Sequence, residues 1–149
     1  MAKIIQNYNK YENYIRIGHT ATSNGDDTYT CTDLQDFPTP AKLSRKLHDV
    51  DKDAFTDLKG YTHRNRVRHD VEDFEVSFPI LSDADEQTIL NMISPEWVYV
   101  EITDKKTGNR KTIKMYASDK EWETFVIWKD DNNNWHTEDV ELTFSMIQQ

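Results

Sequence analysis

The stretch FEVSFPILSDADEQTILNMISPEWVYVEITDKKTGNRKTIKM, residues 74–115, decides the fold class of this chain. It opens with apolar side chains at every second position, which is the pattern of a strand with one buried face. These side chains are Phe74, Val76, Phe78 and Ile80. Proline cannot donate a hydrogen bond to a neighbouring strand, so Pro79 predicts that the strand ends there.

A short helix is predicted directly after this strand. Ser82 is an N-cap residue, and three of the next four residues are acidic, where a helix has unpaired amide donors and the positive end of its dipole. Apolar side chains then recur with helical spacing until Ser94 and Pro95 stop the helix. The sequence predicts one helix from about Asp83 to Ile93, with a narrow apolar stripe that covers one opening of a β layer.

A hairpin completes the stretch. Residues 98–102 alternate between apolar and other side chains, and the polar run 104–109 supplies a turn. The chain returns as a second alternating strand at 111–115, which predicts a cross-strand pair between Glu101 and Lys114. The predicted fold class is therefore mainly β, with antiparallel strands and one short α-helix.

Length and charge limit the classes of protein that fit. A chain of 149 residues fits a single domain, 1–149, in which residues 1–36 are interpreted as an N-terminal extension. With 27 acidic against 18 basic residues and a net charge of -9, the chain is a poor binder of duplex DNA, which requires cations against phosphates. Cys31 has no second cysteine to pair with, and the sequence contains no apolar run that would span a membrane, so we expect a reducing cytoplasm and no membrane anchor.

An acidic segment and a basic stripe lie next to each other before the deciding stretch. The segment 49–59 fits no clean period and is predicted as a long loop, with one helical turn near 53–58. Arg64, Arg66 and Arg68 follow at every second position, so an extended chain displays all three on one side. They suit a solvated strand face, a strip for nucleic acid, or bidentate pairing with carboxylates of the same chain or of a neighbouring copy.

The chemistry-bearing residues form no recognisable catalytic or metal-binding motif. The five histidines lack helical metal-pair spacing, and the alternating carboxylates of 49–53 lack the Gly and the bidentate Glu of a calcium loop. No nucleophile elbow and no Gly-rich phosphate loop occurs. We therefore expect no catalytic residue, no metal, no cofactor and no enzyme activity.

Aromatic residues are dense in the second half of the chain. They suit a carbohydrate platform or, more commonly, core and interface anchors, because they bury a large area at small entropic cost. The residues concerned are Trp97, Tyr99, Trp122, Trp128 and Trp135.

The order of elements in residues 37–147, about three-quarters of the chain, resembles that of small structural proteins from the tails of long-tailed bacteriophages and prophages of Gram-positive hosts. The matching parts are the opening Phe37-Pro38-Thr39-Pro40, the loop with Asp53-Ala54-Phe55 leading to Gly60 and the arginines, the strand ending before Leu81-Ser82, the helix 85–93 with Ser94-Pro95, the hairpin 104–110, and the closing Phe144-Ser145-Met146-Ile147.

The resemblance implies a tail-tube-like antiparallel β-sandwich or barrel whose copies join sheet to sheet into a ring, a hexamer or a trimer. Such proteins have no active site, contact neighbouring tail proteins, and let DNA pass through an acidic channel without specific binding. They belong to the virion tail and are assembled in the host bacterial cytoplasm. The loop 49–60 resembles the arm that tail-tube subunits lay on neighbouring rings.

We therefore expect a structural tail subunit, placed in the tube, the tail end or the baseplate hub, that works by self-assembly. The predicted interface residues are Arg64, Arg66, Arg68, Asp51, Asp53, Phe55 and Lys59.

Two other classes remain open from the residues alone. One is a carbohydrate- or receptor-binding β-sandwich module of a phage baseplate that uses the tryptophans. The other is a small phage-encoded enzyme or inhibitor that acts through its acidic residues as a mimic of DNA.

Overall fold

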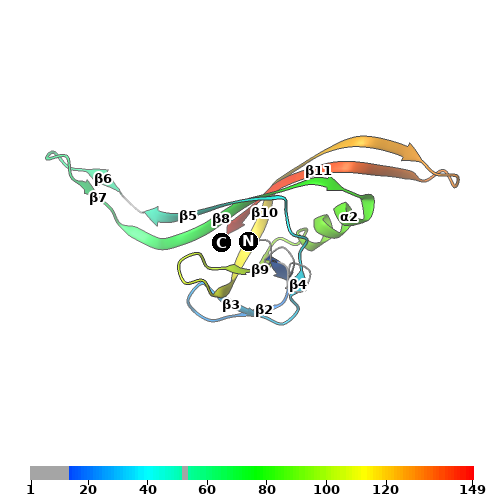
Figure 1. Cartoon of the computed structure of the whole chain (residues 1–149). Coiled ribbons are helices and arrows are strands. Elements are labelled where there is room, and N and C mark those ends of the chain that lie inside the picture. Colours follow the sequence, from blue (N-terminus) through cyan, green and yellow to red (C-terminus); the bar gives the residue numbers. More distant parts are fainter. Residues whose placement is uncertain (1–13, 52–53) are drawn as a thin grey trace, which may run out of the picture.

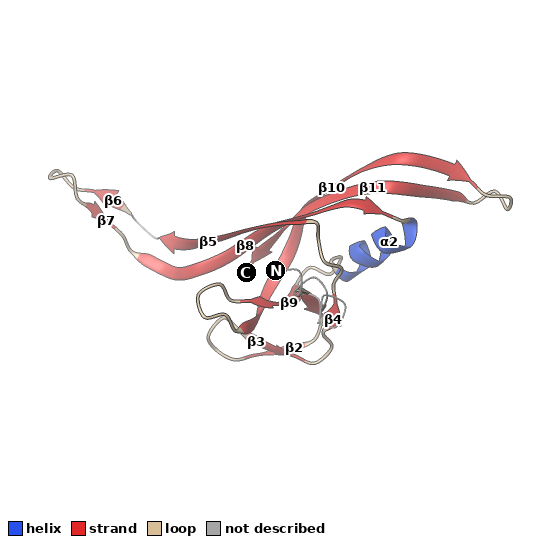
Figure 2. Ribbon diagram, in the orientation of Figure 1, coloured by secondary structure: helices blue, strands red, loops and turns tan. Residues whose placement is uncertain are grey.

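The protein, described by a computed structural model over residues 14–51 and 54–149, is built from antiparallel strands and one helix (Figures 1 and 2). The elements in chain order are β1 (Arg16–Gly18), β2 (Ala21–Ser23), β3 (Tyr29–Cys31), β4 (Gln35–Asp36), β5 (Lys42–Asp51), β6 (Phe55–Thr56), β7 (Thr62–His63), β8 (Arg66–Leu81), α2 (Asp83–Met92), β9 (Val98–Thr103), β10 (Arg110–Lys129) and β11 (Trp135–Gln148). The predicted fold class, mainly β and antiparallel with one short helix, is confirmed.

One seven-stranded sheet organises the molecule, in the order β4-β1-β9-β10-β11-β8-β5. Two small hairpins, β2-β3 and β6-β7, form separate two-stranded sheets. The strand β1 lies inside the large sheet between β4 and β9, with Ile15 and Ile17 buried. Residues 14–36 of the predicted N-terminal extension therefore supply two strands of this sheet and the β2-β3 hairpin, and residues 1–13 lie outside the described part.

The hydrophobic core is formed by buried side chains from the second half of β8, from β9, from the start of β10 and from β11. The segment before β5 contributes Phe37, which is 1% exposed and whose ring lies edge-on to those of Phe78 and Phe144, with centroid distances of 5.8 and 6.3 Å. The helix α2 closes one side of this core through Ile89 and the residue that ends it, Ile93.

The helix begins where the sequence predicts. Ser82 has an extended backbone, and its side chain accepts a hydrogen bond from the Asp85 amide at 3.4 Å. The amide of Ile93 donates to the Ile89 carbonyl and ends the helix one residue after Met92. An N-cap and a stop in the local sequence were enough to place this element.

The strand before the helix continues past the predicted stop. Pro79 does not end it, because β8 bulges there: Phe78 pairs with Leu142, yet Leu81 pairs with Val140, so β8 has one residue more than β11. The bulge changes the parity of the strand. Ile80 was predicted to be buried with Phe78 but is 73% exposed, and Leu81 is buried in its place.

The predicted hairpin is present as β9 and the first part of β10, joined by a turn at 104–109. Its register differs from the expected one by two residues, since Glu101 lies opposite Thr112 and Lys114 opposite Tyr99. The predicted pair between Glu101 and Lys114 is therefore wrong. Glu101 instead accepts from Arg110 at 3.2 Å, and the Lys114 ammonium lies 5.0 Å from the centre of the Trp97 ring.

Two β arms project from the body in opposite directions (Figure 1). The first arm consists of β5, β6, β7 and the start of β8, residues 42–70. The second arm is the hairpin of β10 and β11 beyond the end of β9, residues 117–141. The expectation of a long loop with a helical turn at 49–59 is wrong, since β5 continues to Asp51 and β6 follows. No helix among the described residues is long and apolar enough to cross a membrane.

Candidate functional site

The first arm holds the predicted interface residues, and hydrogen bonds between its two sides align them. The guanidinium of Arg64 donates to Asp51 and to Asp49, each at 3.0 Å, and Arg66 lies 3.4 Å from the same Asp49 carboxylate. The two aspartates hold the pKa of Arg64 above its ordinary value, Asp51 contributing most. Of the interpretations that the sequence left open for these arginines, pairing with carboxylates of the same chain is therefore present, and it joins β5 to the segment leading into β8.

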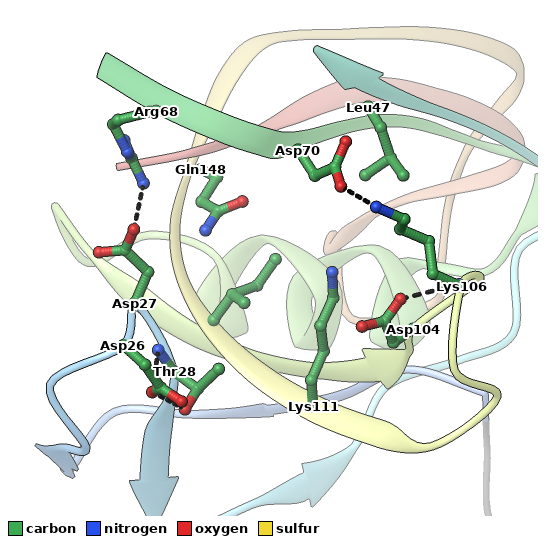
Figure 3. Close-up of a pocket in the computed structure, with 11 residues that line it drawn as sticks. Asp26, Asp27, Thr28, Leu47, Arg68, Asp70, Asp104, Lys106, Lys111 and Gln148 are labelled. Atoms are coloured by element: carbon green, nitrogen blue, oxygen red, sulfur yellow. Dashed lines mark hydrogen bonds and ion pairs between the residues drawn. The ribbon is translucent and has the colours of Figure 1, made fainter. Parts of the chain in front are cut away.

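Arg68 is directed elsewhere. Its guanidinium lies 3.4 Å from Asp27 in the turn after β2 and also donates to the carbonyl of Gln149. Figure 3 shows Arg68 and Asp27 at the side of a hollow of about 210 Å³ at the base of the first arm. On its other side, Lys106 of the turn between β9 and β10 bonds to Asp70. The hollow is therefore a polar seam in which opposite charges tie the first arm to two turns of the body.

The tip of the first arm is apolar and exposed. Phe55 stacks on His63 at a centroid distance of 4.8 Å, and His63 bonds to Asp57 at 2.8 Å. The His63 bond is the largest cause of a lowered pKa at Asp57. Phe55 is 60% exposed, and Leu58 and Tyr61 beside it are also exposed, as is Lys59 in the turn. The predicted site residue Asp53 lies outside the described residues.

The predicted set of interface residues contains none from the second arm, although the sequence analysis interpreted its tryptophans as core or interface anchors. Beyond Val140 its two strands pair only with each other, and large apolar side chains stand open on both of its faces. They are Trp122, Phe125, Val126, Ile127, Trp128 and Trp135. The aromatic density of this segment was visible in the sequence, but whether it is buried depends on which strands lie opposite.

A histidine clamp joins the second arm to the helix. His136 on β11 lies 3.0 Å from Asp83 through Nδ1 and 2.8 Å from Asp130 through Nε2, and its ring stacks on Trp128 at 4.5 Å. Asp130 and then Asp83 hold the pKa of His136 above its ordinary value. The carboxylate of Asp83 also accepts from the Thr137 side chain and amide, which are the main causes of its lowered pKa.

A buried ion network underlies the body. The carboxylate of Glu72 is fully buried. One of its oxygens accepts a hydrogen bond from the guanidinium of Arg45, and the other forms an ion pair with the Lys111 ammonium at 2.9 Å. Arg45 also donates to the Tyr14 hydroxyl at 2.7 Å. This network joins β5, β8 and β10 on the core side of the sheet, where a lone charge would be costly.

The described residues form a β-sheet body from which two exposed arms project. This geometry suits contacts with other proteins. The described residues contain no group of three or more His, Cys, Asp and Glu side chains placed to hold a metal ion.

A family of unknown function, DUF6711, matches residues 31–144. Because the match covers well over half of the sequence, the chain belongs to this family.

Comparison with other proteins gives two further findings. No curated protein matches the sequence. Among solved structures, the virion of a native gene transfer agent (GTA) particle contains a chain that is 13% identical, with a TM-score of 0.39, covering 86% of this chain and 99% of that one. The tail of an empty GTA particle with C6 symmetry contains a chain that is 12% identical, with a TM-score of 0.40 and the same coverage.

Proposed function

We propose that this protein is a non-enzymatic structural subunit of the tail of a bacteriophage or phage-like particle, and that it works by self-assembly. The observation that carries the proposal is the pair of arms projecting in opposite directions from one sheet (Figure 1). Each arm ends in exposed apolar side chains that the isolated chain leaves in contact with water.

The exposed side chains argue for a partner. On one face of the second arm, Phe125, Ile127 and Trp135 are 63%, 64% and 67% exposed. Contiguous apolar patches rimmed by polar groups are typical of protein–protein contact sites. Aromatic side chains are also the residues that most often anchor interfaces.

The edges of the large sheet support assembly between copies. Strand β5 is at one edge, and β10 has no described strand beside it beyond its pairing with β9, which ends at Met115. Such edges carry unpaired backbone groups and favour pairing with another chain. A contact between two different surfaces of the same chain repeats from copy to copy and generates a closed ring or an open filament.

The tail setting comes from the resemblance of residues 37–147 to tail proteins. Within it we propose a ring subunit of the tube, the tail end or the baseplate hub. The net charge of -9 suits a ring that surrounds DNA, since an acidic wall repels phosphates and leaves the DNA free to slide.

The test is the mass and shape of the purified full chain. We expect light scattering over a range of protein concentrations to give a mass several times that of the 17.6 kDa monomer, and negative-stain microscopy of the same sample to show rings or tubes. A chain that remains monomeric at all concentrations would contradict the proposal.

A second candidate function rests on the tryptophans of the second arm. Trp122 and Trp135 are 51% and 67% exposed, and exposed indoles also suit a carbohydrate-binding platform on a phage baseplate. Screening on a glycan array separates the two functions, since a ring subunit binds none of the sugars. A specific sugar that also changes the tryptophan fluorescence would favour the binding module.

A further inference from the structure

The two arms differ in the sign of the charged side chains that form no ion pair within the described part of the chain. On the first arm the described aspartates are all engaged: Asp49 and Asp51 bond to arginines, Asp57 to His63, and Asp70 to Lys106. The lysines Lys42, Lys46 and Lys59 are exposed and form no ion pair with any other described residue. The free charge of the first arm is therefore positive.

The second arm has the opposite balance. Residues 117–141 contain eight acidic and two basic residues. Of the eight, Asp130 bonds to His136, whereas Glu121, Glu123 and Glu141 are among the exposed carboxylates that pair with no cation in the described part of the chain. The Lys129 ammonium is placed over the Trp135 ring, 5.1 Å from its centre. The free charge of the second arm is negative.

Strand register shows which side chains share a surface with these unpaired charges. Glu121 lies opposite Thr143 and Glu123 opposite Glu141, and by alternation Phe125 and Ile127 share their side of β10. On β5, Lys42 and Lys46 lie opposite Ser77 and Asp73, on the side of the strand away from the buried Arg45. The two lysines therefore lie on the edge strand of the sheet, next to Asp73 and the exposed Glu75 of β8. The carboxylates of the second arm lie beside large apolar side chains.

We infer that the acidic, apolar face of the second arm docks on the Lys42–Lys46 surface of β5 in a second copy of this chain. Two second arms do not pair with each other in this way, since their free carboxylates would repel. Two β5 surfaces do not pair with each other either, because their lysines would repel. The inference rests on the proposed function, because it names the contact by which copies join.

Paired charge reversals test the contact. One variant carries Lys42→Glu and Lys46→Glu, a second carries Glu121→Lys and Glu123→Lys, and the third carries all four. The four side chains are exposed and take part in no described ion pair, so each variant should keep the circular dichroism spectrum and unfolding transition of the wild type. Lys105→Glu, in the exposed turn after β9, is the matched control away from both surfaces.

Light scattering at several concentrations then separates the outcomes. We expect each double variant to need about tenfold or more protein to assemble, because like charges now meet at the contact. The quadruple variant should regain assembly, since the charges are again opposite, and Lys105→Glu should behave as the wild type.

Two results would overturn the inference. If the wild type assembles and both double variants assemble equally well, or the quadruple variant stays as impaired as the doubles, this contact is wrong while the proposed function stands. A wild type that never assembles overturns the proposed function and the contact with it.

Discussion

Removing the carboxylate of Glu72 should destabilise the protein more than any surface substitution. Glu72 is 0% exposed, and its two partners are nearly enclosed, with 10% of the Arg45 side chain and 18% of the Lys111 side chain exposed. In Glu72→Ala two cations remain in a poorly hydrated site with no counter-charge. Breaking a buried ion pair by removing one partner costs about 3–5 kcal/mol, a large part of the roughly 5–15 kcal/mol that stabilises a typical domain.

The measurement is urea unfolding at pH 7, followed by tryptophan fluorescence at a concentration where the chain is monomeric. Glu75→Ala on the same strand is the control, because Glu75 is exposed and its loss should change the free energy of unfolding by less than about 0.5 kcal/mol. Replacing Arg45, Glu72 and Lys111 together with methionine should recover most of the loss, since no buried charge is then left alone. A Glu72→Ala variant within about 1 kcal/mol of the wild type would refute this account of the network.

Two further predictions concern packing and pH. A Cβ on Gly18 would lie 2.2 Å from Cys31 Sγ and 2.8 Å from an Asp33 oxygen. Gly18→Ala should therefore lower the free energy of unfolding by about 1–3 kcal/mol. An unchanged thermal unfolding transition would contradict this close packing. Asp130 and Asp83 raise the pKa of His136 in the folded protein. The charged imidazole therefore adds its full stability at pH values below the ordinary histidine pKa of about 6.5. This stability is lost as the pH rises through the raised pKa. The stability advantage over His136→Gln in urea should therefore shrink from pH 6 to pH 9, and a constant difference would exclude a role for the charged imidazole.

Local signals were sufficient for the middle of the chain. The helix needed only Ser82, the acidic first turn and the stop at Ser94 and Pro95, all within a few residues of one another. The strand β9 followed from alternation alone, and Val98, Val100 and Ile102 are all buried. Patterns of this kind depend on neighbours in sequence, which a single chain displays directly.

Contacts between distant segments were beyond such patterns. The acidic segment 49–59 has no period, but Asp49 and Asp51 find their partners in Arg64, 13 to 15 residues away, so the segment becomes one side of an arm. The bulge at Pro79 depends on how β11 pairs with β8 and not on the sequence of β8 alone. His136 showed no ligand or catalytic spacing, because Asp83 lies 53 residues away.

The way in which β8 and β11 share the body has a mechanical consequence. Strand β8 enters from the first arm and β11 from the second, and the two run antiparallel from the Asp73–Ile147 pair to the Leu81–Val140 pair. A force that pulls the arm tips apart therefore loads this ladder along the strands. Its hydrogen bonds must then yield together instead of one after another, so the molecule resists tension best along the line that joins its two tips.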